Sequence, residues 1–321
     1  VRDIDNEENA NILWFVTHFK RNNYIINVLK QAAVGLLKDT TRMSLDDDIM
    51  VFNELMQNVP HLVYEEASVK ENRRNRNEIR DKVQDDYDAE REEYTYEKEK
   101  EDTEDYKQSI EVVEYIKARK LSEALGNILK NYSGSLKKEV KEELAHITLN
   151  LSLKAHAELI SRFSGNTEHL VNLFSEMLLQ KGKMTKEDSI KKSKEFVFAF
   201  VNALCFSVIK NSVNEISTKN LLNAFERIIN DSESPTSLFL ISYGVFLDNQ
   251  IFDDRTISSM RQKYKDLSNN KVARFTLRYL VIEQLLYFEM PPAKKQKVCQ
   301  IFDIDYRAAI KEQQRAAINN N

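Results

Sequence analysis

The longest apolar stretch of the chain runs from Phe196 to Ile209 (FVFAFVNALCFSVI), and only Asn202 and Ser207 interrupt it. An amphipathic surface helix carries polar side chains along one face, whereas this stretch is apolar nearly all round. We therefore expect a helix that is buried on most sides, with Phe200 among its buried residues. The stretch is 14 residues long and has charged residues at both ends, whereas a membrane span needs roughly 18–20 apolar residues. A core helix of a soluble protein is the preferred interpretation.

Apolar residues recur at spacings of three and four along most of the remaining chain, which is the period of an amphipathic helix. We expect segments 168–180, 237–247 and 271–288 to cover the apolar stretch, whose own helix starts after a cap at Thr185 and breaks between Asn211 and Ser217. Further helices are predicted over residues 6–38, 45–56, 109–131, 135–159, 218–229 and 251–265.

Turn-forming residues are scarce, with 6 Gly and 4 Pro in 321 residues. All-β and doubly wound folds need such residues every few positions, so this composition favours long helices with few connections. The predicted fold class is all-α: a multi-helix array or irregular bundle that includes a long charged helical segment.

That charged segment, residues 65–108, holds 17 acidic and 10 basic residues. Its first part is basic and the part from Asp85 to Asp105 is strongly acidic, which allows two interpretations. One is a helical hairpin that turns near Asp85 and Asp86, with the basic limb against the acidic limb; the other is a solvated linker. We favour the helix. The chain then divides into an N-terminal helical segment (1–64), this charged hairpin or linker (65–108) and a main helical domain (109–321).

No familiar catalytic or nucleotide-binding motif is present: the sequence lacks GxxxxGK[ST], GxGxxG, HExxH, CxxC and GxSxG. The acidic triplet Asp46–Asp48 is explained by the first turn of a helix capped by Ser44, where the helix dipole favours negative charge. His146 and His156 are ten residues apart and lack the i,i+4 spacing of a helical metal site. We therefore expect no catalytic, cofactor-binding or metal-binding residues, and a regulatory or recognition region in place of an enzyme.

The net charge of −4 predicts no general attraction to nucleic acid or to an anionic membrane. Two cysteines, Cys205 and Cys299, cannot form a disulfide framework, which favours the cytoplasm. Two basic clusters remain as a candidate contact surface. The first, an arginine cluster, could contact phosphate. The second, at residues 294–297, resembles a nuclear localisation signal. The alternative for the second cluster is the exposed face of a short helix. The clusters consist of Arg73, Arg74, Arg76 and Arg80, and of Lys294, Lys295 and Lys297.

Three segments resemble a known family. They are residues 119–153, above all ALGNILKNYSGSLK, then residues 272–304 (VARFTLRYLVIEQLLYFEMPPAKKQKVCQIFDI), and more weakly residues 13–23 (LWFVTHFKRNN). In this order they resemble the C-terminal helical region of bacterial STAND-type P-loop NTPases, many of which act in anti-phage defence. These segments contain no catalytic residues, so no ATP-binding position carries over to this chain.

The resemblance implies that ATP and Mg²⁺ bind an upstream module, and that the helical region senses a trigger or restrains that module. Trigger binding would then promote ATP-dependent assembly and effector activation. The implied partners are proteins: the upstream module, a phage trigger or a second copy. Because the chain begins at Val1 in place of Met, it is expected to be either processed or a piece of a longer polypeptide, and we favour the latter. The alternatives are a nucleic-acid-associated helical protein, an all-α protein-interaction scaffold and an enzyme with an unfamiliar all-α site.

Overall fold

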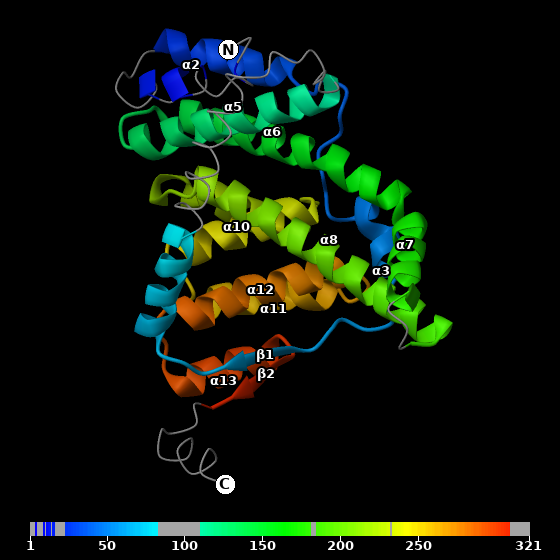
Figure 1. Ribbon diagram of the computed structural model, residues 1–321. Helices are drawn as coiled ribbons and strands as arrows, with labels where there is room; N and C mark the ends of the chain where they lie inside the picture. The colour runs from blue at the N-terminus through cyan, green and yellow to red at the C-terminus, as the bar shows by residue number, and fades with distance from the viewer. Residues whose placement is uncertain are drawn as a thin grey trace. The chain divides into compact units, whose positions relative to one another are not determined.

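The computed structural model describes residues 4, 9, 11–13, 15–16, 23–82, 110–180, 184–231 and 233–308. These residues form an array of helices with one pair of short strands, which confirms the all-α class (Figure 1). The longer helices are α2 (Asn23–Gly35), α5 (Ile110–Tyr132), α6 (Lys138–Gly165), α7 (Thr167–Gln180), α8 (Lys186–Ile216), α9 (Leu222–Asn230), α10 (Thr236–Asp248), α11 (Asp254–Asp266), α12 (Lys271–Tyr287) and α13 (Pro292–Ile301). Shorter elements are η1 (Asp47–Ile49), α3 (Met50–Asn53), η2 (Lys219–Leu221), β1 (Leu62–Glu65) and β2 (Ile304–Arg307).

The chain divides into two compact units. The larger unit combines residues 1–60 with residues 110–279, and the smaller unit combines 61–109 with 280–321, so that the division falls inside α12. The boundaries that we expected near 64 and 108 lie within a few residues of two of these division points. The unit division, however, joins the N-terminal segment to the main domain and the charged segment to the end of the chain.

In the larger unit, helices that follow one another pack as neighbours: α5 lies against α6, α7 against α8, and α9 against α10. Figure 1 shows α2 lying over α5 and α6, in agreement with their contacts. Helix α8 contacts α5, α6, α7 and α10. Helix α12 also reaches α8 in this unit, since the rings of Phe198 and Phe275 are 6.2 Å apart between centroids. The three segments that we expected to cover the apolar stretch therefore all do so.

Helix α8 begins as predicted, because the Thr185 side chain accepts a hydrogen bond from the Asp188 backbone N–H. It does not break between Asn211 and Ser217 but continues to Ile216. Among the described residues it is the one helix long and apolar enough to cross a membrane by length and composition, and half of that window is buried in the protein. Phe198, Val201 and Cys205 are buried against neighbouring helices, as in a core helix.

The expectation that Phe200 is buried was wrong. Phe200 is 45% exposed and Phe196 is 53% exposed, although Val197, Phe198 and Val201 are buried. The reason is the packing of the helices around α8. They cover the sides of α8 that carry Val197, Phe198 and Val201 and leave the row through Phe196 and Phe200 uncovered.

The acidic triplet has a structural role, although the helix predicted over 45–56 is shorter than expected and spans η1 and α3. Asp48 accepts hydrogen bonds from the backbone N–H and the hydroxyl of Ser44, both at 2.9 Å. Asp46 accepts from the backbone N–H and the hydroxyl of Thr236 at the first turn of α10. Asp46 thus satisfies a free N–H at a helix N-terminus, where a carboxylate is also favoured by the helix dipole.

In the smaller unit, β1 and β2 pair in parallel, with Leu62 opposite Ile304 and Glu65 opposite Arg307. Residues 69–82 are helical. The helix that we favoured within 65–108 is therefore present over residues 69–82, although Glu65 is the last residue of β1. The predicted turn near Asp85 and the acidic limb lie outside the described residues. A strand at this position depends on a partner far along the sequence, which the local pattern of charges does not reveal.

Candidate functional sites

The first predicted contact cluster lies along the C-terminal end of α12. Arg73 donates to the Tyr287 carbonyl at 2.6 Å, and its guanidinium lies 5.5 Å from the centre of the Phe288 ring. Arg76 stacks over Tyr287 at 4.2 Å. Cation–π contacts of this kind stabilise by about 0.5–1 kcal/mol at exposed sites. Arg73 and Arg76 therefore hold the helix of residues 69–82 against α12 within the smaller unit.

The other two arginines of the cluster have acidic neighbours. Arg74 is 3.5 Å from Glu78, and Arg80 is 3.8 Å from Asp81, all with exposed side chains. Exposed ion pairs of this kind contribute little to stability. We expected the acidic block from Asp85 to Asp105 to be the partner of these arginines, and that block lies outside the described residues.

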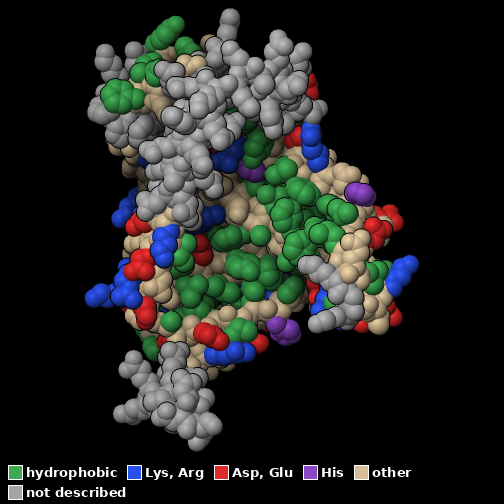
Figure 2. Space-filling model, in the orientation of Figure 1, with side chains coloured by type: hydrophobic (Ala, Val, Ile, Leu, Met, Phe, Trp, Pro, Cys, Tyr) green, Lys and Arg blue, Asp and Glu red, His purple; other side chains and the backbone are tan. Residues whose placement is uncertain are grey.

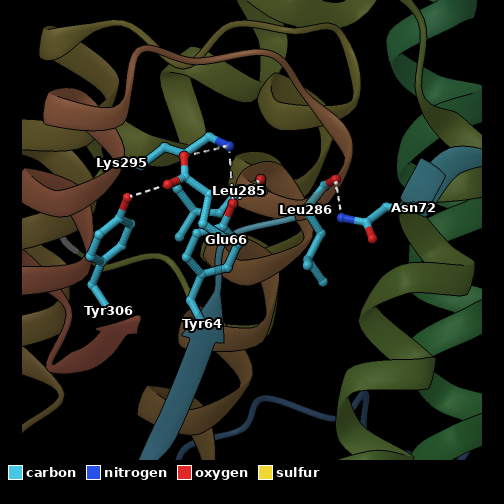
Figure 3. Close-up of polar contacts among 7 residues, drawn as sticks. All are labelled: Tyr64, Glu66, Asn72, Leu285, Leu286, Lys295 and Tyr306. Atoms are coloured by element: carbon cyan, nitrogen blue, oxygen red, sulfur yellow. Dashed lines mark hydrogen bonds and ion pairs between the residues drawn. The ribbon is translucent and has the colours of Figure 1, made fainter. Parts of the chain in front are cut away.

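Residues of the smaller unit also satisfy the last carbonyls of α12, which have no partner within the helix. The Tyr64 hydroxyl donates to the Leu285 carbonyl at 3.0 Å, and the Asn72 amide donates to the Leu286 carbonyl at 3.1 Å (Figure 3). With the Arg73 bond to Tyr287, three consecutive carbonyls are capped by side chains from residues 64–73.

The second predicted cluster is only partly a surface. Lys295 is buried, so its assignment to a contact surface was wrong, whereas Lys294 is half-buried and Lys297 is exposed. Lys295 donates to the Tyr64 hydroxyl at 3.0 Å and lies 3.8 Å from a Glu66 carboxylate oxygen (Figure 3). Its position one turn before the buried Val298 and Cys299 places it on the inner side of α13, where these partners compensate its charge.

Tyr306 completes the polar cluster around Glu66. Its hydroxyl donates to the second Glu66 oxygen at 2.6 Å, and this bond to a carboxylate raises the pKa of Tyr306 to about 12. Figure 3 shows Lys295 and Tyr306 meeting the Glu66 carboxylate, while the Tyr64 hydroxyl lies between Lys295 and the Leu285 carbonyl. Because these bonds connect β1, β2, α12 and α13 with one another, the cluster acts as a structural tie of the smaller unit.

An exposed apolar surface lies on α7 and α8. Its members are large apolar side chains with at least two fifths of their surface exposed: Leu173, Met177, Phe196 and Phe200, here called the α7–α8 face. Two half-buried rings support it from below. Phe174 meets Phe196 edge to face at 4.6 Å between centroids, and Phe163 meets Phe200 at 5.2 Å. Figure 2 shows hydrophobic side chains gathered over this part of the molecule.

The α7–α8 face was missed from the sequence, although a signal for it existed. Leu173 and Met177 are four residues apart on α7, as are Phe196 and Phe200 on α8, so that each helix presents one row. The row on α8 continues to Lys192 on one side and Ser207 on the other, both exposed. A lysine and a serine in line with two phenylalanines indicate a solvent-facing row, in contrast to the all-round burial that the run of apolar letters suggested.

Two ionisable groups, the half-buried Glu215 and the buried His156, lie between helices of the larger unit. The Ser122 hydroxyl of α5 donates to the Glu215 carboxylate of α8 at 2.5 Å, and burial raises the pKa of Glu215 to about 7. His156 Nδ1 lies 2.7 Å from the Ser152 carbonyl, and burial lowers the pKa of His156. Among the described residues, no three His, Cys, Asp or Glu side chains are grouped so that they could hold a metal ion.

Comparison with known proteins found no matching family model, no matching curated protein and no matching solved structure.

Proposed function

We propose that this chain is the helical sensor or scaffold region of a STAND-type NTPase in anti-phage defence. In this proposal it acts in the cytoplasm by binding protein and catalyses no reaction itself. ATP and Mg²⁺ belong to an upstream module, whose assembly and effector activation the chain controls. The family assignment rests on the segments 119–153 and 272–304, and the protein-binding role is supported by the α7–α8 face.

The composition of the α7–α8 face is that of a protein-binding surface. Soluble proteins rarely expose large apolar side chains in groups unless the surface binds something. Two phenylalanines provide rigid anchors, and Met177 is a flexible side chain that adapts to its partner. Lys192, on the same row one turn before Phe196, adds a positive charge at one end of the face.

The partner that fits this geometry is an amphipathic helix with an acidic residue near one end. The rows on α7 and α8 belong to neighbouring helices that pack together, and two such rows can receive the apolar ridge of a third helix. An acidic residue of that helix would lie opposite Lys192. Binding of the trigger or of the upstream module on this face would shift the population between a closed and an assembled state.

Site-specific photo-crosslinking tests this proposal in the intact protein. A photoreactive phenylalanine analogue at Phe200 is expected to crosslink to an amphipathic helix of the NTPase module or of a phage protein. The control places the same analogue at Met50, an apolar position of the larger unit that is somewhat more exposed than Phe200. The same crosslinked partner from both positions, or a partner without an amphipathic helix at the crosslink, would contradict specific binding at the α7–α8 face.

A peptide with the sequence of the crosslinked helix then allows the affinity to be measured by fluorescence anisotropy. The double variant Phe196→Ser/Phe200→Ser is expected to weaken binding about tenfold or more, because such anchors supply most of the binding energy. The matched control Val34→Ser/Met50→Ser also removes two exposed apolar side chains and should leave the affinity within about twofold. ATP hydrolysis by the purified chain would refute the non-catalytic role.

A further inference from the structure

A cavity of about 170 Å³ lies between α6, α9 and α10 in the larger unit. One wall is apolar and includes Leu149, Leu153, Phe225 and Ile228. The other wall is polar, and one row of α6 contributes Glu142, His146 and Asn150 to it. A cavity with one apolar and one polar wall is matched by an amphipathic ligand, because each part of the ligand meets groups of its own polarity.

The charges at the mouth of the cavity favour an anion. Glu142 is neutralised by Arg227, whose guanidinium lies 2.5 Å from its carboxylate. Arg42 lines the same cavity and is half-buried. Within the part of the chain that the structure describes, its guanidinium has neither an ion pair nor a hydrogen bond. The Arg42 guanidinium could therefore bind a carboxylate through two parallel hydrogen bonds.

We propose that this cavity binds a small monocarboxylate with an apolar tail, the carboxylate on Arg42 and the tail against Leu149, Leu153 and Phe225. The size limits the ligand: at the ~30 Å³ that a water molecule occupies in the liquid, 170 Å³ is the space of about six water molecules, which suits a short-chain acid. This is smaller than a drug-sized pocket of about 300–1,000 Å³. A bound ligand would link α6 to α9 and α10, and the proposal is independent of the α7–α8 face.

Methyl NMR of the full chain with hexanoate as the probe tests the site. Hexanoate is expected to shift the methyl signals of Leu149, Leu153 and Ile228 in a saturable manner with one molecule per chain. Hexylamine has a similar tail but a positive charge, so it should leave these signals unchanged. The absence of a saturable shift up to about 10 mM hexanoate, where a millimolar site would be largely filled, would overturn the proposal. Equal shifts with hexylamine would overturn it as well.

Two variants assign the roles of charge and space. Arg42→Gln is expected to weaken hexanoate binding about tenfold or more, as for the loss of a charged hydrogen bond. The matched control is Arg261→Gln on α11, which removes the same charge from an exposed arginine and should leave binding unchanged. Equal affinities for the two variants would refute recognition by Arg42.

If Arg42→Gln fails to fold, Ala224→Leu serves instead, since its larger side chain fills the cavity and should abolish binding. Retained binding in Ala224→Leu would place the ligand elsewhere.

Discussion

Two sides of helix α8 show how the same residue type can serve two purposes. Phe198 and Phe200 are two positions apart, yet Phe198 is 1% exposed and Phe200 is 45% exposed. Phe198 faces α12, where its ring meets Phe275. Phe200 lies on the α7–α8 face, where the Phe163 ring meets it edge to face. The first side contributes to stability and the second provides a surface for a partner, so hydrophobicity alone does not distinguish core from interface.

The largest expected effect tests this comparison directly. Phe198→Ala should lower the free energy of unfolding by about 3–5 kcal/mol, because it removes a buried ring and leaves a cavity. Phe200→Ala removes the same atoms from an exposed position and should cost less than about 1 kcal/mol. Urea denaturation followed by circular dichroism measures both. Equal losses would show that the two sides of α8 do not differ in burial.

The Glu215 carboxyl, near the C-terminal end of α8, should make the stability of the protein depend on pH. Its pKa rises from 4.5 in the unfolded chain to about 7 in the folded protein, mainly through burial, with Arg119, Glu123 and Lys130 of α5 as the nearby charges. Ionisation is therefore harder in the folded state. The resulting loss of stability begins above pH 4.5, grows through pH 7 and is complete above it.

Glu215→Gln keeps a hydrogen-bond acceptor for Ser122 but cannot ionise. Its stability gain over the wild type should be about 2–3 kcal/mol larger at pH 8 than at pH 5. Urea midpoints at the two pH values, with the exposed Glu195→Gln as control, measure the difference. A gain that does not change with pH would argue against burial of the carboxyl between α5 and α8.

A smaller effect is expected where α5 approaches the backbone of α8. A Cβ atom at Gly126 would lie 2.6 Å from the Glu215 carbonyl oxygen. Gly126→Ala should therefore destabilise by about 1–3 kcal/mol, although alanine is the better helix former. Gly35→Ala, at the end of α2 with open space around it, should be neutral or gain up to about 1 kcal/mol. Thermal unfolding of both variants would reveal whether the two helices separate to admit a methyl group.

The smallest effect on stability concerns the exposed row itself. Lys192→Glu should change the free energy of unfolding by less than about 0.5 kcal/mol, since the side chain is exposed. It should nevertheless weaken binding of an acidic amphipathic helix, because it places like charges opposite each other. A variant with unchanged affinity would exclude Lys192 from the interface while leaving the apolar contacts to be tested by the phenylalanine variants.

Much of the helical array follows from local patterns. The cap at Thr185, the limits of α7 and α12, and the covering of α8 by three helices were predicted from spacing and capping residues. The uncovered side of α8 was not, because burial of Phe196 and Phe200 depends on where neighbouring helices end in space. Lys295 illustrates the same limit: its burial requires Glu66 and Tyr64, which are more than 200 residues away in the sequence.

Strand β2 has a consequence for the order in which the protein folds. Its Arg307 pairs with Glu65 of β1 across 242 residues of sequence. During synthesis, β1 therefore leaves the ribosome long before its partner exists, while the helices of the larger unit can already pair with their neighbours. Contacts of such large sequence separation form slowly. We expect the smaller unit to complete its fold last, with the edge of β1 available to chaperones until then.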